Sequence, residues 1–280
     1  MIRDILSAVS VFLLLGAAQP VHAQNSGLER LTRPDQIISW KAVGRVDIGT
    51  SGYCTGTLIA PDLVLTAAHC LFDDSGAPRD IEKFLFRAGY ADGASVAESR
   101  IVRATAHESY DHQGGGKIKG DEIRHDVALL QLESPIQSAI APPFAVDSPG
   151  NGDEVSVVSY ARGRSEALSW QRRCTVLGRQ GGLIAVDCDV TFGSSGAPVF
   201  DRSQGRARIV SIISGGGTYR DGVVAFGMEL PRLVSQLKAQ LRADRGVIGA
   251  APKPGASVRR ISVGSGERAG GARFLKVPGN

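Results

Sequence analysis

Short apolar runs of about four to eight residues follow one another between Trp40 and Phe226. They are rich in Val and Ile, and Gly, Pro, Asp and Asn separate them. Runs of this kind at close spacing predict β-strands. They lie at 56–68 (GTLIAPDLVLTAA), 83–90 (KFLFRAGY), 99–107 (SRIVRATAH), 125–134 (HDVALLQLES), 153–163 (DEVSVVSYARG), 181–190 (GGLIAVDCDV), 197–201 (APVFD) and 207–217 (ARIVSIISGGG). Because closed sheets leave no exposed edges, ~190 residues of short strands favour an all-β fold of two packed barrels.

One segment, 230–246 (LPRLVSQLKAQLRADRG), has a helical period instead. The apolar residues Leu230, Leu233, Val234, Leu237 and Leu241 fall on one face of a helix, and Gly246 is a stop signal. The pattern therefore predicts that one C-terminal helix closes the strand-rich body.

The pattern also divides the chain. Residues 24–39 are polar with few strand cues, and we interpret them as an N-terminal segment or a short pro-segment. The strand-rich body and its helix form one predicted domain, 40–243. Residues 244–280 form a basic tail rich in Gly, Ala and Pro, which we expect to be disordered, although RRISV and ARFLKV within it could pair as a hairpin.

The first 23 residues resemble a secretory signal. Arg3 lies in a short n-region, an apolar core follows from about Val9 to Ala18, and small residues precede an expected cleavage after Ala23. The core is too short to span a bilayer, which disfavours the alternative of an uncleaved anchor. No other segment reaches transmembrane length. We therefore expect a secreted or periplasmic protein with no membrane segment in its mature form.

Export changes how the four cysteines are interpreted. Cys54, Cys70, Cys174 and Cys188 allow three disulfide connectivities, and none of their spacings is Cys-x-x-Cys, which argues against a zinc or redox motif. In an oxidising compartment we expect the local pairs Cys54–Cys70 and Cys174–Cys188. Each closes a loop of about 15 residues and contributes roughly 3 kcal/mol in the loop-entropy model.

The net positive charge of the chain would suggest an anionic partner, but this charge lies in the C-terminal tail. The chain has 280 residues, 42% of them hydrophobic, and a formal net charge of +4. From Ala243 onward, seven basic and two acidic residues contribute +5, so residues 1–242 sum to −1. A neutral body gives no electrostatic support for binding nucleic acid.

Three polar residues in the strand-rich body suggest catalysis. His69 follows an apolar strand and precedes Cys70, Asp126 opens an apolar run, and Ser195 lies in a Gly-Ser-Ser-Gly turn. A serine hydroxyl becomes nucleophilic when a base such as imidazole takes its proton, and the imidazole needs an acceptor that fixes its tautomer. Each residue also has a structural alternative: a polar turn for Ser195 and a buried core histidine for His69.

Together these motifs carry a resemblance. The order His, Asp, Ser, with TAAHC at 66–70, D-V-A-L-L from 126 and G-x-S-G-x-P-V from 193, resembles the chymotrypsin/trypsin superfamily of serine endopeptidases over residues 40–243. The resemblance implies two six-stranded antiparallel β-barrels (a chymotrypsin-like fold) and a C-terminal helix. It also implies that His69 is the general base, that Asp126 orients it and that Ser195 is the nucleophile. The backbone N–H groups of Gly193 and Ser195 would form the oxyanion hole.

Two positions depart from the superfamily pattern. Ser194 replaces the Asp that in trypsin-like zymogens pairs with a newly cut N-terminus, and no Ile-Val-Gly-Gly start is evident. We therefore expect other contacts to stabilise the oxyanion loop, as in the bacterial glutamyl endopeptidases that DCDVTFGSSGAP also resembles. Ala197 replaces a glycine, which is harmless if its φ is negative.

The resemblance also suggests substrate contacts. Asp189 lies six residues before the nucleophile, where trypsin-like enzymes bind a substrate Arg or Lys, although Asp187 competes for that role. Ser214, Gly215 and Gly216 are the expected pocket wall and the strand on which an extended peptide adds by β-pairing. Glutamyl preference has less support, because residues 201–280 contain no histidine to bind a substrate carboxylate.

The sequence thus predicts an exported, monomeric serine endopeptidase that acts on protein or peptide substrates, with cleavage after Arg or Lys as one hypothesis. The stretch HESYDH at 107–112 could suggest metal ligation, but structural or surface roles are favoured. We expect no metal and no cofactor. The alternatives are a catalytically inactive protease homologue that acts as a binding module and a glutamyl-specific endopeptidase.

Overall fold

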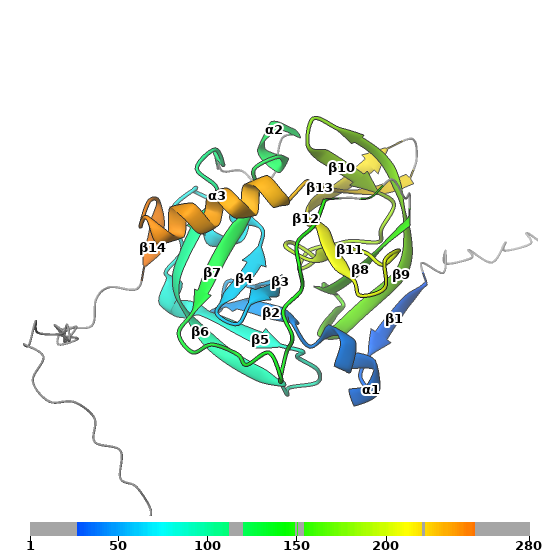
Figure 1. The fold of residues 1–280 in the computed structure, drawn as a ribbon, viewed down its shortest axis with the longest axis horizontal. Coiled ribbons are helices and arrows are strands. Elements are labelled where there is room, and N and C mark those ends of the chain that lie inside the picture. The colour runs from blue at the N-terminus through cyan, green and yellow to red at the C-terminus, as the bar shows by residue number, and fades with distance from the viewer. Residues whose placement is uncertain (1–26, 112–119, 149, 151–153, 220–221, 250–280) are drawn as a thin grey trace, which may run out of the picture. The chain divides into compact units, whose positions relative to one another are not determined.

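The fold is that of a computed structural model, which describes residues 27–111, 120–148, 150, 154–219 and 222–249 (Figure 1). The predicted signal, most of the tail and His112 lie outside these residues. The helices are α1 (Pro34–Ile37), α2 (Gly120–Ile123) and α3 (Pro231–Arg242), with single 3₁₀ turns η1 (Ile38–Trp40), η2 (Ala68–Leu71) and η3 (Ile81–Lys83). The strands are β1 (Leu28–Leu31), β2 (Val43–Ile48), β3 (Tyr53–Ala60), β4 (Leu63–Thr66), β5 (Phe84–Ala88), β6 (Ala97–Ala106), β7 (Ala128–Leu132), β8 (Glu154–Ala161), β9 (Arg164–Gln180), β10 (Leu183–Val186), β11 (Pro198–Asp201), β12 (Arg208–Tyr219), β13 (Gly222–Met228) and β14 (Val247–Gly249).

The strands form two closed antiparallel barrels of six strands each. In the first barrel the order is β6-β5-β2-β3-β4-β7, and β7 pairs back with β6 to close the ring. In the second the order is β9-β10-β13-β12-β11-β8, and β8 pairs back with β9. The predicted fold class is therefore confirmed. Closure leaves few strand edges exposed, which keeps both sheets from pairing with other chains.

Each barrel carries one further strand, which comes from the opposite end of the chain. Strand β1 precedes the first barrel in sequence but pairs with β9 of the second, with Leu28 opposite Gln171. Strand β14 follows the second barrel but pairs with β6 of the first, with Val247 opposite Thr105. The two strands therefore link both ends of the described chain to the barrel that is distant in sequence.

The apolar runs identified in the sequence all contain strands, but the pattern missed others. Strand β9 is 17 residues long and carries the polar stretch Arg172–Arg173, which conceals its period. Strand β1 lies in the segment with few strand cues and is held by its pairing with β9. Strand β14 shows that the beginning of the predicted tail, residues 247–249, pairs with the first barrel.

The predicted C-terminal helix is α3. Its apolar face packs against β6 and β7 of the first barrel. Leu230, Val234, Leu237 and Leu241 are buried and Leu233 is partly buried, as the period predicted. The chain leaves the helix through a left-handed backbone at Asp244 (φ 57°) and Gly246 (φ 59°). None of the helices in the described ranges is long and apolar enough to cross a membrane.

Candidate active site

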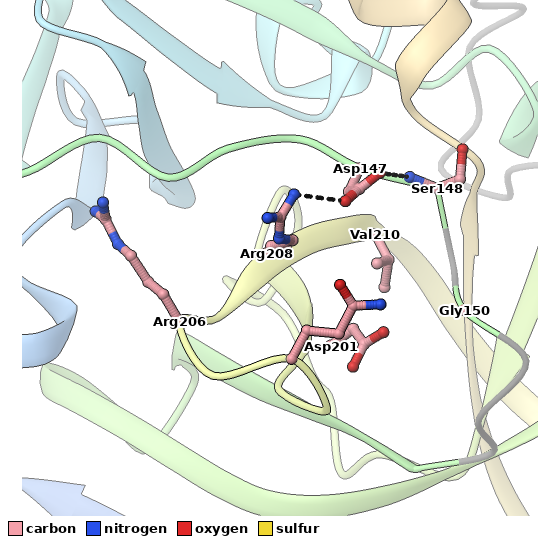
Figure 2. Close-up of a pocket in the computed structure, with 8 residues that line it drawn as sticks. Asp147, Ser148, Gly150, Asp201, Arg206, Arg208 and Val210 are labelled. Carbon is pink, nitrogen blue, oxygen red and sulfur yellow. Dashed lines mark hydrogen bonds and ion pairs between the residues drawn. The ribbon is translucent and has the colours of Figure 1, made fainter.

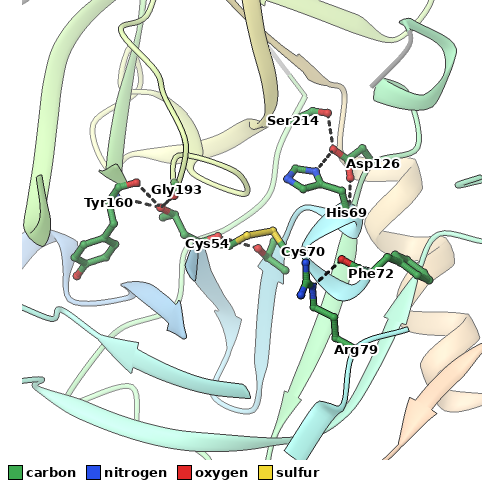
Figure 3. Close-up of a disulfide and its surroundings, with 11 residues drawn as sticks. Cys54, His69, Cys70, Phe72, Arg79, Asp126, Tyr160, Gly193 and Ser214 are labelled. Atoms are coloured by element: carbon green, nitrogen blue, oxygen red, sulfur yellow. Dashed lines mark hydrogen bonds and ion pairs between the residues drawn. A yellow bond between two sulfur atoms is a disulfide. The ribbon is translucent and has the colours of Figure 1, made fainter. Parts of the chain in front are cut away.

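A histidine and an aspartate from two parts of the first barrel meet at its edge (Figure 3). His69 lies in η2, directly after β4, and Asp126 immediately precedes the run that becomes β7. Because β4 and β7 pair side by side, with Thr66 opposite Ala128, their ends bring the two residues together. The His69 Nδ1 atom lies 2.7 Å from Asp126 Oδ2, and the backbone N–H of His69 donates to Asp126 Oδ1 at 2.8 Å.

Burial makes this pair electrostatically strong. The Asp126 side chain is fully buried, whereas the His69 side chain is 20% exposed. Burial by itself lowers the pKa of the His69 imidazole, but the charge of Asp126 and its hydrogen bond outweigh that effect, so the pKa is raised above its usual value. The bond through Nδ1 leaves Nε2 as the ring nitrogen available for proton transfer, because Asp126 accepts the Nδ1 hydrogen.

A third residue completes the environment of Asp126. The hydroxyl of Ser214 donates to Asp126 Oδ2 at 2.5 Å, and Ser214 is buried. The pairing of β12 with β13 shifts register between Ile213 and Gly215, so Ser214 lies in an irregular part of the strand. Such irregularities redirect a side chain out of the regular alternation, here toward the carboxylate. Ser214 was predicted as a pocket-wall residue, and no local sequence pattern indicated its contact with Asp126.

Ser195 lies on the loop between β10 and β11, and a backbone hydrogen bond connects it to the strand next to the turn that carries His69. Its carbonyl accepts a hydrogen bond from the backbone N–H of Thr55 at 2.8 Å. Thr55 is adjacent to Cys54, and the disulfide from Cys54 reaches Cys70, the residue after His69. The backbone of Ser195 is therefore connected to the turn that carries the imidazole.

A second contact ties the same loop to the side of Asp126. The N–H of Gly196 donates to the carbonyl of Ile213 at 2.7 Å, and the next residue, Ser214, bonds to Asp126. A Cβ added to Gly196, which has φ 78°, would lie 2.3 Å from the carbonyl oxygen of Thr55. Only glycine allows the loop to approach β3 this closely, which explains the glycine after the predicted nucleophile.

The structure thus pairs His69 with Asp126 and fixes the backbone of Ser195 through neighbours of both. Among the hydrogen bonds of the described residues, none joins Ser195 Oγ to the His69 ring. In unliganded enzymes such contacts are often long and shorten when substrate binds. Ser195 is partly exposed, and rotation about its Cα–Cβ bond moves the hydroxyl without moving the backbone.

The predicted oxyanion donors belong to a turn that depends on glycine. The N–H of Ser194 donates to the carbonyl of Thr191 at 2.9 Å, and Gly193 within this turn has φ 92°. In the part of the chain that the structure describes, the N–H groups of Gly193 and Ser195 donate to no other group, so both can bind an oxyanion. Ala197 is not among the described residues with positive φ, so its side chain is tolerated.

Both predicted disulfides are present in the structure. Cys54–Cys70 joins β3 to η2 beside His69, and Cys174–Cys188 joins β9 to the segment after β10. Atoms of Cys54, His69 and Cys70 lie within 4.8 Å of one another, a spacing that could suggest a metal site. Because both sulfurs are engaged in the disulfide, they are not thiolate ligands.

The other described histidines are engaged elsewhere. The rings of His107 and His125 stack at 5.1 Å, and His107 Nε2 lies 3.1 Å from Gln236 Oε1 on α3. Burial, together with repulsion from His107, lowers the pKa of His125. His107 therefore bonds α3 to the segment after β6, a structural role consistent with the interpretation of HESYDH.

The two acids that compete for substrate binding have different surroundings. The carboxylate of Asp187 accepts a hydrogen bond from the backbone N–H of Thr175. Asp189 is exposed, and its carboxylate has no hydrogen bond among the described residues, while its carbonyl accepts from Arg164 Nη2 at 3.0 Å. Burial lowers the pKa of Arg164, and the nearby charge of Asp189 opposes that shift. Asp189 is therefore the freer acid, with a competing cation beside it.

Gly215 and Gly216 lie on β12 opposite Phe226 and Ala225 of β13, and Gly216 is exposed. A Cβ at Gly216 would approach the Val190 side chain at 3.2 Å, so glycine at this position leaves space beside Val190, the residue after Asp189.

A separate pocket of about 30 Å³ lies between Asp147, Asp201 and β12 (Figure 2). It holds an ion pair between Arg208 and Asp147 and includes none of the predicted site residues.

Comparison with known proteins shows what the chain as a whole is similar to. A family model described as trypsin-like peptidase domain matches residues 54–208. Serine protease 23 of Rattus norvegicus is 30% identical over 187 residues, which cover 58% of this chain and 48% of that protein. Trypsin Blo t 3 of Blomia tropicalis is 28% identical over 161 residues, 54% of each chain. The chain thus spans about half the length of these curated relatives.

Two solved structures share the fold. One, a Glu endopeptidase in complex with MPD, covers 76% of this chain and 95% of its own length, with a TM-score of 0.61 and 19% identity. The other, the thermostable serine protease AL20 from an extremophilic microorganism, covers 72% of this chain and 98% of its own, with a TM-score of 0.58 and 22% identity. At these identities the likeness establishes the two-barrel fold.

Proposed function

Because the chain belongs to the family of trypsin-like peptidase domains, whose model matches more than half of it, we propose that it is a serine endopeptidase that hydrolyses peptide bonds of protein substrates. The observation that carries this proposal is the bond between His69 Nδ1 and the fully buried Asp126 carboxylate. A buried carboxylate on Nδ1 supports the function of the imidazole as a base through Nε2. The N–H groups of Gly193 and Ser195, which donate to no other group within the described ranges, support an oxyanion site.

The proposed chemistry has two halves. Ser195 Oγ attacks the carbonyl carbon of the scissile peptide while His69 Nε2 takes the hydroxyl proton, and the N–H groups of Gly193 and Ser195 bind the resulting oxyanion. The intermediate collapses, the C–N bond breaks, and His69 gives the proton to the leaving amine. Water then attacks the acyl-enzyme by the same route and releases Ser195. These steps use no metal or cofactor.

The proposed setting is the exterior of the cell or a periplasm, with the protein acting as a monomer. Two disulfides in a chain whose first residues resemble a secretory signal support an oxidising compartment. We propose cleavage after Ala23 and removal of the signal.

Substrate preference depends on Asp189 in this proposal. Its carboxylate has no hydrogen bond among the described residues, and Gly216 leaves space beside the neighbouring Val190. A substrate Arg or Lys can therefore pair with Asp189. Arg164 lies beside Asp189 and competes with that cation. We therefore propose cleavage after Arg or Lys with only moderate selectivity. Residues 201–280 contain no histidine that could bind a substrate carboxylate, which disfavours glutamyl preference.

Labelling of the nucleophile tests the proposal against the alternative of an inactive binding module. A fluorophosphonate probe reacts with a serine only when the base and the oxyanion site activate it. We expect the full chain to become labelled at Ser195, and Ser195→Ala to remain unlabelled. Ser194→Ala is the matched control, and it should still react. Absence of labelling in the wild-type protein, or labelling that persists in Ser195→Ala, would contradict the proposed mechanism.

A further inference from the structure

The loop that carries the proposed oxyanion donors has four consecutive backbone carbonyls, from Phe192 to Ser195, and each of them accepts a hydrogen bond. In a trans peptide the C=O and the following N–H point in opposite directions. Fixing the carbonyls of Phe192 and Ser194 therefore orients the N–H groups of Gly193 and Ser195. The question is what fixes this loop in a chain that has Ser194 at the position of the zymogen Asp.

Three of the four carbonyls are fixed by backbone groups. Phe192 O accepts from Arg162 N–H at 2.7 Å, Ser194 O from Ala197 N–H at 2.9 Å, and Ser195 O from Thr55 N–H at 2.8 Å. Any residue except proline can supply such a donor. These three contacts therefore depend on the fold and say little about particular side chains.

The fourth carbonyl, that of Gly193, is fixed by a side chain. The hydroxyl of Thr55 donates to Gly193 O at 2.8 Å, and it accepts the backbone N–H of Tyr160 at 3.0 Å. Thr55 is fully buried on β3, so water does not compete for these bonds. Gly193 and Tyr160 lie next to each other in Figure 3, close to Cys54. The hydroxyl of Thr55 therefore joins the loop to both barrels at once.

The hydroxyl of Ser194 is held less tightly. Ser194 Oγ lies 3.5 Å from Ser159 Oγ and 3.4 Å from the N–H of Thr191, both at the upper limit for a hydrogen bond. The ring of Tyr53, two residues before Thr55, covers Gly193, because a Cβ added to Gly193 would lie 2.3 Å from the ring. Among the side chains that the structure describes, that of Thr55 therefore makes the short, buried hydrogen bond to this loop.

We propose that Thr55 is a positioning residue for catalysis. It holds the Gly193–Ser194 peptide, which connects the two peptides that carry the oxyanion donors, so that both donors are in place before substrate binds. This inference rests on the proposed serine endopeptidase function and assigns to Thr55 the stabilising role that a charged N-terminus has in zymogen-derived relatives. Because the hydrogen bond from Thr55 to Gly193 is already formed in the folded chain, activity does not require a newly cut N-terminus.

The experiment compares two threonines on the same strand. Thr55→Val removes the bonded hydroxyl with little change in volume. Thr57→Val is the matched control, because Thr57 is also fully buried but its hydroxyl has no hydrogen-bond partner among the described residues. We expect Thr55→Val to lower kcat by about 10- to 100-fold with KM unchanged, less than the ~10²–10³-fold loss of an oxyanion donor itself. Thr57→Val should leave both constants unchanged, and Thr55→Ser should restore most of kcat.

Thermal unfolding of each variant, with kinetics measured well below every midpoint, separates positioning from stability. If Thr55→Val fails to fold, Thr55→Ala removes the same hydroxyl with less crowding and takes its place. A kcat for the Thr55 variant equal to that of Thr57→Val, or a loss that Thr55→Ser does not rescue, overturns the inference. A wild-type protein that does not react with the fluorophosphonate instead overturns the proposed function itself, so the two failures are distinguishable.

Discussion

The imidazole of His69 is subject to two opposing effects on its pKa. Burial lowers it, and the Asp126 carboxylate at 2.7 Å raises it by more. The general base must be neutral, so kcat/KM should rise with pH, with a midpoint above the usual value of about 6.5. Asp126→Asn should shift this midpoint to lower pH and reduce kcat/KM by up to about 10⁴-fold. A pH–rate profile of both proteins measures this, and a wild-type midpoint below 6.5 would contradict it.

The raised pKa of His69 also makes folding stability depend on pH, in the opposite direction to activity. The folded protein holds the His69 proton more tightly than the unfolded chain, so unfolding releases a proton between the two pKa values. The contribution of the His69–Asp126 pair to stability is therefore fully present below about pH 6.5 and is lost as the pH rises through the raised pKa. Near neutral pH, this pair contributes less to stability as activity increases.

Arg164, the cation beside Asp189, is expected to weaken the binding of a substrate Arg or Lys to Asp189. Arg164→Gln removes a positive charge next to Asp189, so kcat/KM for substrates with Arg should rise by about fivefold, or ~1 kcal/mol for unit charges in a hydrated setting. Asp189→Asn should lower it, while Asp187→Asn, which changes an acid bonded to Thr175, should leave the preference unchanged. Profiling a peptide library measures all three. Cuts after acidic or aliphatic residues in the wild type would exclude Asp189 as the determinant.

At the level of elements, the two disulfides form a natural comparison. Their loops have sequence separations of 16 and 14, so each contributes roughly 3 kcal/mol in the loop-entropy model. Replacing either pair by alanines should lower the unfolding midpoint by roughly 6–12 °C. Cys70 lies in the same 3₁₀ turn as His69, so loss of the Cys54–Cys70 pair should also reduce kcat, by about 10-fold or more.

Loss of the Cys174–Cys188 pair serves as the control for this prediction, since it lies on β9 and after β10. It should reduce stability and leave kcat nearly unchanged. Calorimetry gives the midpoints, and steady-state kinetics below both midpoints gives kcat. An equal loss of kcat in the two variants would mean that the first disulfide does not position His69.

At the level of the whole molecule, the N-terminal segment is packed into the second barrel. Strand β1 pairs with β9, and its Leu31 is 1% exposed. Trp40, the residue directly after this segment, contacts the rings of Trp170 and Phe200, and both ring centroids lie 5.1 Å away. If this segment is structural and not an inhibitory pro-segment, Leu31→Ala should lower the free energy of unfolding by about 2–5 kcal/mol.

Leu177→Ala on the partner strand is the matched control, because Leu177 is 49% exposed and should change stability by less than about 0.5 kcal/mol. A chain that begins at Pro34 should be less stable than one that begins at Gln24 and no more active. Urea unfolding and peptide hydrolysis measure the two quantities. Higher kcat/KM after this truncation would support the pro-segment interpretation instead.

The amino-acid sequence by itself determined the fold class and the three candidate catalytic residues. Strand periodicity is local, so the apolar runs and the helix at 231–242 could be recognised without the fold. The motifs around His69, Asp126 and Ser195 could be recognised because catalysis requires those residue types, and because their order along the chain resembles that of the chymotrypsin/trypsin superfamily. The local cysteine pairs could also be predicted, because short loops favour them.

Tertiary structure alone decided which polar groups meet outside the predicted catalytic residues. Thr55 and Gly193 are separated by 138 positions, and Ser214 and Asp126 by 88. Their contacts depend on how the barrels pack and on one irregularity in β12, which no local pattern encodes. The pairing of β1 with β9 was likewise invisible, because a short strand gains its stability from its partner and not from its own sequence.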